Sequence, residues 1–397
     1  MPDLPRGARG AGPAGAVTDP GICCTMEDPK ALVLAFVLAL VAGCSARGPE
    51  LRVVSSTAPS VVATPRERLA KVTAPKLPMP PEVQAKTPTE PRACSFDDAE
   101  KNPPGFYPSD AWPKGEVVLT FDDGPHPGKT PKVLDLLKKH GMPATFFLVG
   151  RAINRDTYPL VQRMVAEGHT LASHSYNHDV GMAVRNHGER SVEYIRGQHE
   201  VTQILIDLAL VAKSKDDFDA LFVRVFEQKA GQYLSGGSLR TGWQGFAARH
   251  AEVLTERGFA DGRRPYTVVH SRPPAGTPYV GLSTPAQKKL YDAALARLGL
   301  LNVMWHGESG DTNAARKYDY AYLTANLAHF SKKGGVILIH DYVRTDALSA
   351  ALAGMAADPN VRVVPIEAAV QRKYGCASVQ IAAALGGREA RRVTAAR

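Results

Sequence analysis

This sequence has no nucleic-acid-binding motif and no internal repeat, and its long apolar run is too short to cross a membrane. The first two absences exclude repeat architectures and give no ground for a nucleic-acid partner. The run, Ala31–Gly43, has thirteen residues, whereas a spanning helix needs about 20. It resembles the core of a signal peptide. The following Cys44 completes what resembles a bacterial lipoprotein cleavage box, Val-Ala-Gly-Cys.

Cleavage at that box would make Cys44 the lipidated first residue of a protein held in the bacterial cell envelope, periplasmic or on the cell surface. The flank before the apolar run, Met26–Lys30, carries one positive charge. If Met26 is the true start, residues 1–25 are not part of the protein. An uncleaved anchor or a chance apolar stretch remains the alternative. We therefore predict that residues 1–44 are a leader and lipoprotein signal peptide.

Cysteine is scarce, with five in 397 residues. Cys23 and Cys24 fall in the leader, and Cys44 would go to lipid. Cys94 and Cys376 remain, and an exported protein permits a disulfide between them. Their pairing is a hypothesis that thiol labelling of unfolded, unreduced protein tests.

The chain carries a modest net charge of +9. Four arginines against one glutamate lie in the last ten residues, within a basic tail that we place at 379–397. A basic balance favours an anionic cell-wall polymer or a membrane surface as partner, or reflects solubility alone. We expect a monomer.

The order of apolar and polar segments divides the rest of the chain. Residues 45–113 are rich in Pro, Ser, Thr and Ala and indicate an extended linker. Residues 114–378 alternate predicted strands and helices, and a single β/α barrel takes about 250 residues. Strands are expected near 117–121, 145–149, 169–172, 266–270, 301–305, 335–339 and 361–364. Helices are expected near 130–140, 158–167, 189–210, 285–299, 318–330, 345–356 and 366–373.

Two adjacent carboxylates, Asp122 and Asp123, follow the first predicted strand and precede a Gly-Pro turn. Adjacent acids repel each other, and they are tolerated when a metal takes one and a cation or proton takes the other. The alternative is a solvated turn. Two imidazoles, His174 and His178, follow the third strand at a spacing that brings both to one ion if the chain makes a helical turn. Together these residues predict an Asp-His-His site.

Three further strand ends carry polar or turn-forming residues. His340 follows the strand that ends at Ile339, Arg272 and Pro273 follow His270, and Asp311 lies in a loop after Trp305. Such groups gather at the C-terminal face of a β/α barrel. The bland alternatives are a surface arginine, a histidine at the end of a strand and an ordinary acidic loop. We interpret His126 and His306 as loop residues.

With these motifs in place, residues 115–375 resemble the polysaccharide deacetylase family, carbohydrate esterase family four. The Thr-Phe-Asp-Asp-Gly-Pro and His-Ser-x-x-His stretches carry the resemblance, and Arg-Pro-Pro-x-Gly and Leu-x-His-Asp support it. The resemblance implies an α/β fold, a distorted (β/α) barrel of about seven strands. It implies a divalent metal, usually zinc. The ligands would be Asp123, His174 and His178.

The resemblance also assigns roles around that metal. Asp122 would be the general base, held by Arg272, and His340 the general acid, oriented by Asp311. Leu338 would line the pocket for the acetyl methyl group.

Three positions near the acetyl pocket depart from the family pattern. Thr312 replaces a tryptophan that normally walls the pocket, and Glu308 stands where the family has an aspartate. Ala275 replaces an aromatic residue whose backbone amide helps to hold the oxyanion. A backbone donor survives a side-chain change, so these departures bear on substrate preference more than on the reaction.

The stretch between His178 and Arg272 is longer than the resemblance implies, with the excess at about 212–262. Its apolar pattern predicts helices at Asp216–Tyr233 and Trp243–Arg257 around a Gly-rich link. As a hypothesis this insertion shapes access for a polymer, with Tyr233 and Trp243 stacking on sugars. The alternative is that both aromatics pack the insertion against the barrel.

The leading interpretation is a metal-dependent enzyme that removes N-acetyl groups from N-acetylglucosamine-containing cell-wall or extracellular glycan, peptidoglycan or poly-N-acetylglucosamine. An O-acetyl esterase on a xylan-like glycan would use the same site. A catalytically silent glycan-binding lipoprotein is a third possibility, which the changes at Glu308, Thr312 and Ala275 allow.

Overall fold

The computed structural model describes residues 104–185, 188–259 and 263–385. The predicted leader, the lipidation site Cys44 and Cys94 lie outside these residues. Cys376 forms a disulfide, and its pairing with Cys94 stays a prediction. No helix within the described ranges is both long enough and apolar enough to span a bilayer.

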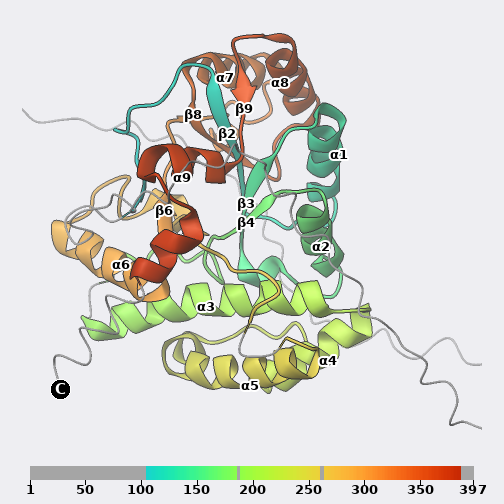
Figure 1. The fold of residues 1–397 in the computed structure, drawn as a ribbon, viewed down its shortest axis with the longest axis vertical. Helices are drawn as coiled ribbons and strands as arrows, with labels where there is room; N and C mark the ends of the chain where they lie inside the picture. Colours follow the sequence, from blue (N-terminus) through green and yellow to red (C-terminus); the bar gives the residue numbers. More distant parts are fainter. Residues whose placement is uncertain (1–103, 186–187, 260–262, 386–397) are drawn as a thin grey trace, which may run out of the picture. The chain divides into compact units, whose positions relative to one another are not determined.

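The described chain is built on one sheet of parallel strands, curled into a distorted (β/α) barrel (Figure 1). The strands are β1 Gly105–Phe106, β2 Glu116–Asp122, β3 Ala144–Leu148, β4 Thr170–Ser173, β5 His270–Ser271, β6 Leu301–Val303, β7 Gly307–Glu308, β8 Gly335–His340 and β9 Arg362–Val363. Their order is β1-β6-β5-β4-β3-β2-β8-β7, with β9 also paired to β2. Three residues separate β6 from β7, so one short segment links the last strand, β7, to the strand next to the opposite end of the sheet, β6.

Apart from the consecutive helices between β4 and β5, helices follow most of the longer strands, as predicted. They are α1 Thr130–His140, α2 Tyr158–Ala166, α3 Glu189–Val211, α4 Lys215–Phe226, α5 Trp243–Glu256, α6 Pro285–Leu298, α7 Tyr320–Lys333, α8 Thr345–Ala357 and α9 Ile366–Tyr374. Local signals explain several ends. In α6, Thr284 caps the first turn with a reciprocal Gln287 contact, and Gly299 ends the helix in a left-handed conformation.

Alternation along β2 and β8 decides which side chains enter the barrel. Val117 and Leu119 pack into the outer core beneath the helices, whereas Val118 and Val336 pack into the inner one. Since successive side chains of a strand point to opposite faces, every second residue after Val118 and Val336 also faces inward. These positions include Asp122 and His340, which are opposite each other in the register.

The insertion is a helical hairpin, as expected, and it packs on α3 (Figure 1). In Figure 1, α3 lies between the strands and the α4–α5 pair. Its first helix ends at Phe226, earlier than the predicted Tyr233. Trp243 is buried, and the Arg196 guanidinium lies 4.8 Å from its ring centroid, so its proposed role as a sugar platform was wrong. Tyr233 is 52% exposed and remains available.

The edges of the barrel also differ from prediction. β1 lies in the expected linker and pairs with β6. Ile381 and Leu385, in the expected tail, are buried in the inner core. The predicted strand 266–270 is reduced to His270–Ser271. These segments pair or pack through partners distant in sequence, which local periodicity does not report.

Candidate metal and acid–base site

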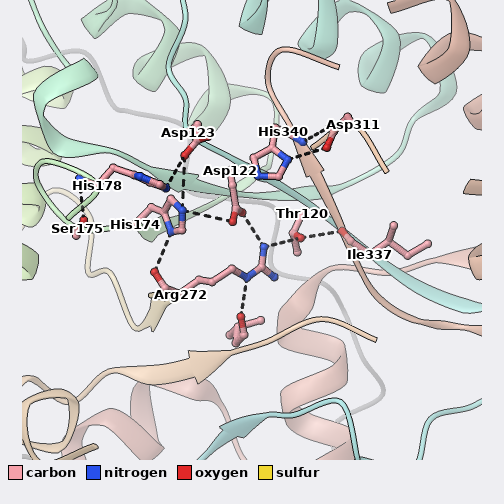
Figure 2. A network of polar contacts seen from close by, with 11 residues as sticks. Thr120, Asp122, Asp123, His174, Ser175, His178, Arg272, Asp311, Ile337 and His340 are labelled. Carbon is pink, nitrogen blue, oxygen red and sulfur yellow. Dashed lines mark hydrogen bonds and ion pairs between the residues drawn. The ribbon is translucent and has the colours of Figure 1, made fainter. Parts of the chain in front are cut away.

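The two acids that end β2 take different directions. Asp122 is the last residue of the strand and is buried inside the barrel. Asp123 has a φ of 71°, in the left-handed region, and its side chain is partly exposed. The change of backbone conformation between them points the two carboxylates in different directions, Asp122 toward Arg272 and Asp123 toward His178. His174 Nε2 lies 3.6 Å from an oxygen of each (Figure 2).

Asp123, His174 and His178 come together at this point, as the sequence predicted. The Asp123 Oδ1 atom lies 3.6 Å from His174 Nε2 and 3.3 Å from His178 Nε2. One ligand atom from each of the three lies within 4.8 Å of the others. Asp123 Oδ1 is buried and accepts no hydrogen bond from any residue that the structure describes. One carboxylate and two imidazoles form a ligand set typical of catalytic zinc, so the residues fit a divalent ion.

The tautomer of His174 suits a ligand. Its Nδ1–H donates to the backbone carbonyl of Arg272 at 2.8 Å. A carbonyl can only accept, so the lone pair lies on Nε2, toward Asp123. Burial lowers the pKa of His174 to about 3, which keeps the ring neutral. The backbone around His178 is held by its N–H, which donates to Ser175 Oγ at 3.1 Å.

Arg272 is fully buried and holds Asp122. Its Nη1 donates to Asp122 Oδ1 at 2.6 Å and to Thr120 Oγ1 at 3.0 Å, and its Nε donates to the Val303 carbonyl at 2.7 Å. The surface-arginine alternative is therefore wrong. Its guanidinium also lies 4.1 Å from the ring centroid of Phe147.

The pKa of Asp122 is raised, because burial outweighs the opposing charge and hydrogen bond of Arg272. Its second oxygen, Oδ2, lies 3.6 Å from His174 Nε2. One oxygen of Asp122 is thus tied to the arginine and the other faces the ligand cluster. A carboxylate with a raised pKa beside a candidate metal position is a stronger base than an ordinary aspartate.

His340 and Asp311 form a second buried pair on the other side of Asp122 (Figure 2). The Asp311 carboxylate accepts from His340 Nδ1 at 2.8 Å through one oxygen and from the His340 backbone N–H at 2.8 Å through the other. Burial lowers the pKa of His340, but the hydrogen bond and charge of Asp311 prevail, with the charges of the β2 aspartates, and raise it to about 9. Tyr342 stacks on the ring at a centroid distance of 5.0 Å.

Comparison with known proteins supports the family resemblance that these motifs carry. Residues 110–209 match the family model described as polysaccharide deacetylase. The resemblance to the polysaccharide deacetylase family is confirmed.

Two curated relatives illustrate the match. A chitooligosaccharide deacetylase of Sinorhizobium fredii is 51% identical over 77 residues, 19% of this chain and 35% of that protein. A peptidoglycan-N-acetylglucosamine deacetylase of Bacillus cereus is 44% identical over 98 residues, 24% of this chain and 34% of that protein. The chain thus spans about a third of the length of these curated relatives.

Among solved structures, the Xyl-CE4 domain of a multidomain xylanase from the hindgut metagenome of Trinervitermes trinervoides aligns with 66% of this chain and 91% of that chain. The TM-score is 0.42 and the identity 20%.

The remaining predicted positions lie on β8 or four residues after the ends of β5 and β7. Leu338 is two residues before His340 on β8 and therefore shares its inward face. Ala275 is exposed with a φ of 52°, and Thr312 is exposed. Trp305, which the sequence did not single out, has its ring centroid 5.6 Å from the Arg272 guanidinium.

Sequence reasoning missed several groups that support this polysaccharide deacetylase motif set. Thr120 accepts from Arg272 and donates to the Ile337 carbonyl at 2.8 Å. Asp341 is buried, accepts from the Thr130 hydroxyl, and has its pKa raised to about 7 by burial. Alternation along the Thr-Phe-Asp motif could have placed Thr120 on the face of Asp122. No local signal pairs Asp341 with Thr130.

His126 and His306 are loop residues, as predicted. The Nδ1 of His306 accepts from the Val336 N–H at 3.1 Å, near the start of β8 and away from its His340 end.

Proposed function

We propose that this protein is a metal-dependent hydrolase that removes N-acetyl groups from an N-acetylglucosamine-containing glycan, peptidoglycan or poly-N-acetylglucosamine. One observation carries the proposal: the Asp123–His174–His178 cluster lies beside a base candidate held by an arginine, and a protonated acid candidate held by an aspartate lies on the other side of that base. Amide hydrolysis needs both proton-transfer groups, because an amine leaves only after it is protonated.

Asp123, His174 and His178 would hold the ion, with zinc as the candidate of choice for this donor set. Bound there, a divalent ion supplies Lewis acidity toward the water and the acetyl carbonyl. The three residues contribute one negative charge and two neutral rings. The buried Asp123 Oδ1, which accepts no hydrogen bond from the described residues, supports this assignment from the protein side.

Asp122 Oδ2 takes the proton of the attacking water, since Oδ1 is committed to Arg272. Arg272 keeps the carboxylate in place during the transfer. A positioned base of this kind contributes roughly 10²–10⁴-fold to the rate.

His340 gives its Nε2 proton to the departing amine. Its Nδ1–H keeps its hydrogen bond to the Asp311 carboxylate, and this carboxylate stabilises the imidazolium before the transfer. With a pKa of about 9 the ring carries its proton at neutral pH. Leu338, on the same inward face, would line the space for the acetyl methyl group.

The proposed setting is the bacterial cell envelope, with the protein lipid-anchored at Cys44, periplasmic or at the cell surface, and monomeric. The predicted lipoprotein box supports the anchor. An O-acetyl esterase remains a second candidate, because ester hydrolysis depends less on the acid.

Acetate release from a panel of acetylated glycans, with and without chelator, tests the proposal. We expect wild type to release acetate from an N-acetylated glycan only when metal is present, and Asp122→Asn and His340→Gln to lose at least 100-fold in kcat while they keep the metal. His329→Gln, an exposed histidine on α7, is the matched control and keeps full activity.

Release from acetylated xylan alone, with His340→Gln little affected, would favour the esterase. No release from any glycan by metal-loaded protein would favour a binding module.

A further inference from the structure

The helical insertion forms two clefts with the polypeptide around His174 and His178. The first cleft has a volume of about 490 Å³ and is lined by residues that include Arg151, Asn154, Tyr176, Lys229, Gln232 and Tyr233. The second has a volume of about 320 Å³ and is lined by residues that include Met182, Arg185, Arg190, Tyr194, Gly236 and Arg240. Each cleft takes one wall from the insertion or its neighbour α3 and one from the barrel loops.

Hydrogen bonds connect the first cleft to the loop that carries the candidate metal ligands His174 and His178. Tyr176 stands between His174 and His178 in sequence, and its backbone carbonyl accepts from the Arg151 N–H at 2.8 Å. Its hydroxyl accepts from the Leu234 N–H at 3.0 Å. The insertion is therefore fastened to the loop that carries both imidazoles, and a glycan bound at the metal has its flanking sugars beside the insertion.

The acidic residues of the first cleft are already neutralised. Asp156 pairs with Lys215 at 2.5 Å, and Asp219 pairs with Arg155 at 2.6 Å. Arg151 lines the same cleft and is exposed, with no ion pair among the described residues. Lys229, also exposed, is unpaired within those ranges too. Within the described part of the chain, the cleft thus presents two cations that no acidic side chain pairs with.

The second cleft also has an excess of cationic side chains. Of its lining residues in the described chain, none is acidic. Arg185 is paired with Asp179. Arg190 and Arg240 are exposed and, among the residues that the structure describes, have no ion pair. Four cations that have no ion pair among the described residues therefore flank the loop of the candidate metal site, and such a group attracts anions.

Tyr233 adds an apolar platform. Its ring is 52% exposed at the edge of the first cleft, with its centroid 5.8 Å from that of Tyr176. Aromatic rings present a flat apolar face beside a polar tip. A sugar ring needs the face, and an acidic substituent on that sugar needs the cations.

We propose that the insertion builds a binding site for the carboxylate groups of the glycan strand, with Arg151 and Lys229 in the first cleft, Arg190 and Arg240 in the second, and Tyr233 under a sugar. The proposal rests on the proposed function, since it names the glycan as one that carries carboxylates as well as N-acetyl groups. A neutral N-acetylated polymer leaves these cations unused.

The test uses zinc-loaded, full-length Asp122→Asn protein, so that the ligand is not consumed. One probe is an oligosaccharide of alternating N-acetylglucosamine and N-acetylmuramic acid, and its partner has every carboxylate converted to a methylamide. Calorimetry should give roughly 3- to 30-fold tighter binding of the acidic probe, from two or more exposed charge contacts. This preference should shrink in 0.5 M salt.

Paired glutamine variants locate the effect. Arg151→Gln with Lys229→Gln, and Arg190→Gln with Arg240→Gln, should each reduce the preference for the acidic probe. Lys132→Gln with Lys139→Gln removes the same charge from the exposed face of α1 and should leave it unchanged. Tyr233→Ala should weaken both probes alike.

Equal binding of the two probes, or an equal loss in the α1 control, would overturn the proposal. If binding to anionic phosphatidylglycerol vesicles depends on the cleft cations while the two probes bind equally well, the clefts bind a membrane and the proposal also fails. Acetate release by the protein with Asp122 intact separates the two claims. Acetate release without a preference for the acidic probe refutes the carboxylate-binding site alone. A preference for the acidic probe without acetate release refutes the proposed function alone.

Discussion

Replacement of Asp311 by asparagine tests the acid–base arrangement most directly. The Asp311 carboxylate accepts from both His340 Nδ1 and the His340 backbone N–H. Asparagine keeps one acceptor oxygen and removes the negative charge. Since burial by itself lowers the pKa of His340, loss of the charge should bring the pKa from about 9 to its ordinary 6.5 or below.

The structure sets the size of this effect. A fall of about 2.5 pH units corresponds to about 3 kcal/mol between the two protonation states. At pH 8 the protonated fraction of His340 should drop about 30-fold, and kcat with it, because only the protonated ring can donate. In the metal-loaded enzyme a cation offsets part of the charge on Asp123. The fall of kcat on the alkaline side then occurs at a lower pH in both proteins. The variant still loses activity at lower pH than wild type.

The sign for stability follows from the same shift. A histidine with a raised folded pKa stabilises the protein fully below its unfolded pKa and loses this contribution as the pH rises through the folded value. The difference in free energy of unfolding between wild type and Asp311→Asn should therefore be largest below pH 6.5. It should narrow as the pH rises toward 9.

NMR titration of His340 in metal-free protein, together with kcat measured against pH, provides the assay. Glu308→Gln is the matched control, because Glu308 is exposed near the same loop and makes no contact with His340 among the described residues. An unmoved alkaline limb in Asp311→Asn, or an equal movement in Glu308→Gln, would refute the reasoning.

Three other substitutions probe the remaining parts of the site. His178→Ala should weaken zinc binding at least 10-fold, since even outer partners of metal ligands are worth 10–100-fold; competition with a chelator measures this. Arg272→Met should lower the free energy of unfolding by about 3–5 kcal/mol in urea, because it leaves the buried carboxylate of Asp122 unpaired. The cost should be smaller in an Asp122→Asn background. Gly124→Ala should lower the melting temperature, since a Cβ there would lie 2.3 Å from Asp341 Oδ2, and crowding of this kind costs about 1–3 kcal/mol.

Each has a control or a contradicting outcome. His329→Gln should bind zinc as wild type does, being exposed on α7. An equal cost of Arg272→Met in both backgrounds would mean that its stability role does not depend on Asp122. Gly128→Ala should be tolerated, because the nearest atom to its Cβ would be 3.7 Å away.

Much of the fold was predictable because its signals are local. The helix expected at 130–140 is α1 Thr130–His140, and the strand expected at 335–339 is β8 Gly335–His340. Each is encoded by a period of apolar residues and by end signals within one segment. β1 and β5 were missed or misplaced, because each has two residues and is defined by pairing with strands distant in sequence, β6 for β1 and both β4 and β6 for β5.

By itself the sequence determined which groups stand at the ends of strands, since Asp122, Asp123 and His340 follow apolar runs directly. Tertiary structure alone decided what those groups meet. The Arg272 carbonyl orients His174 from 98 residues away, and the hydrogen bond and charge of Asp311 keep His340 protonated at neutral pH despite its burial. The fold also buried Trp243 and left Tyr233 open. Which residue follows a strand is fixed by the local sequence, whereas the burial of a group and the charges around it depend on every segment that packs nearby.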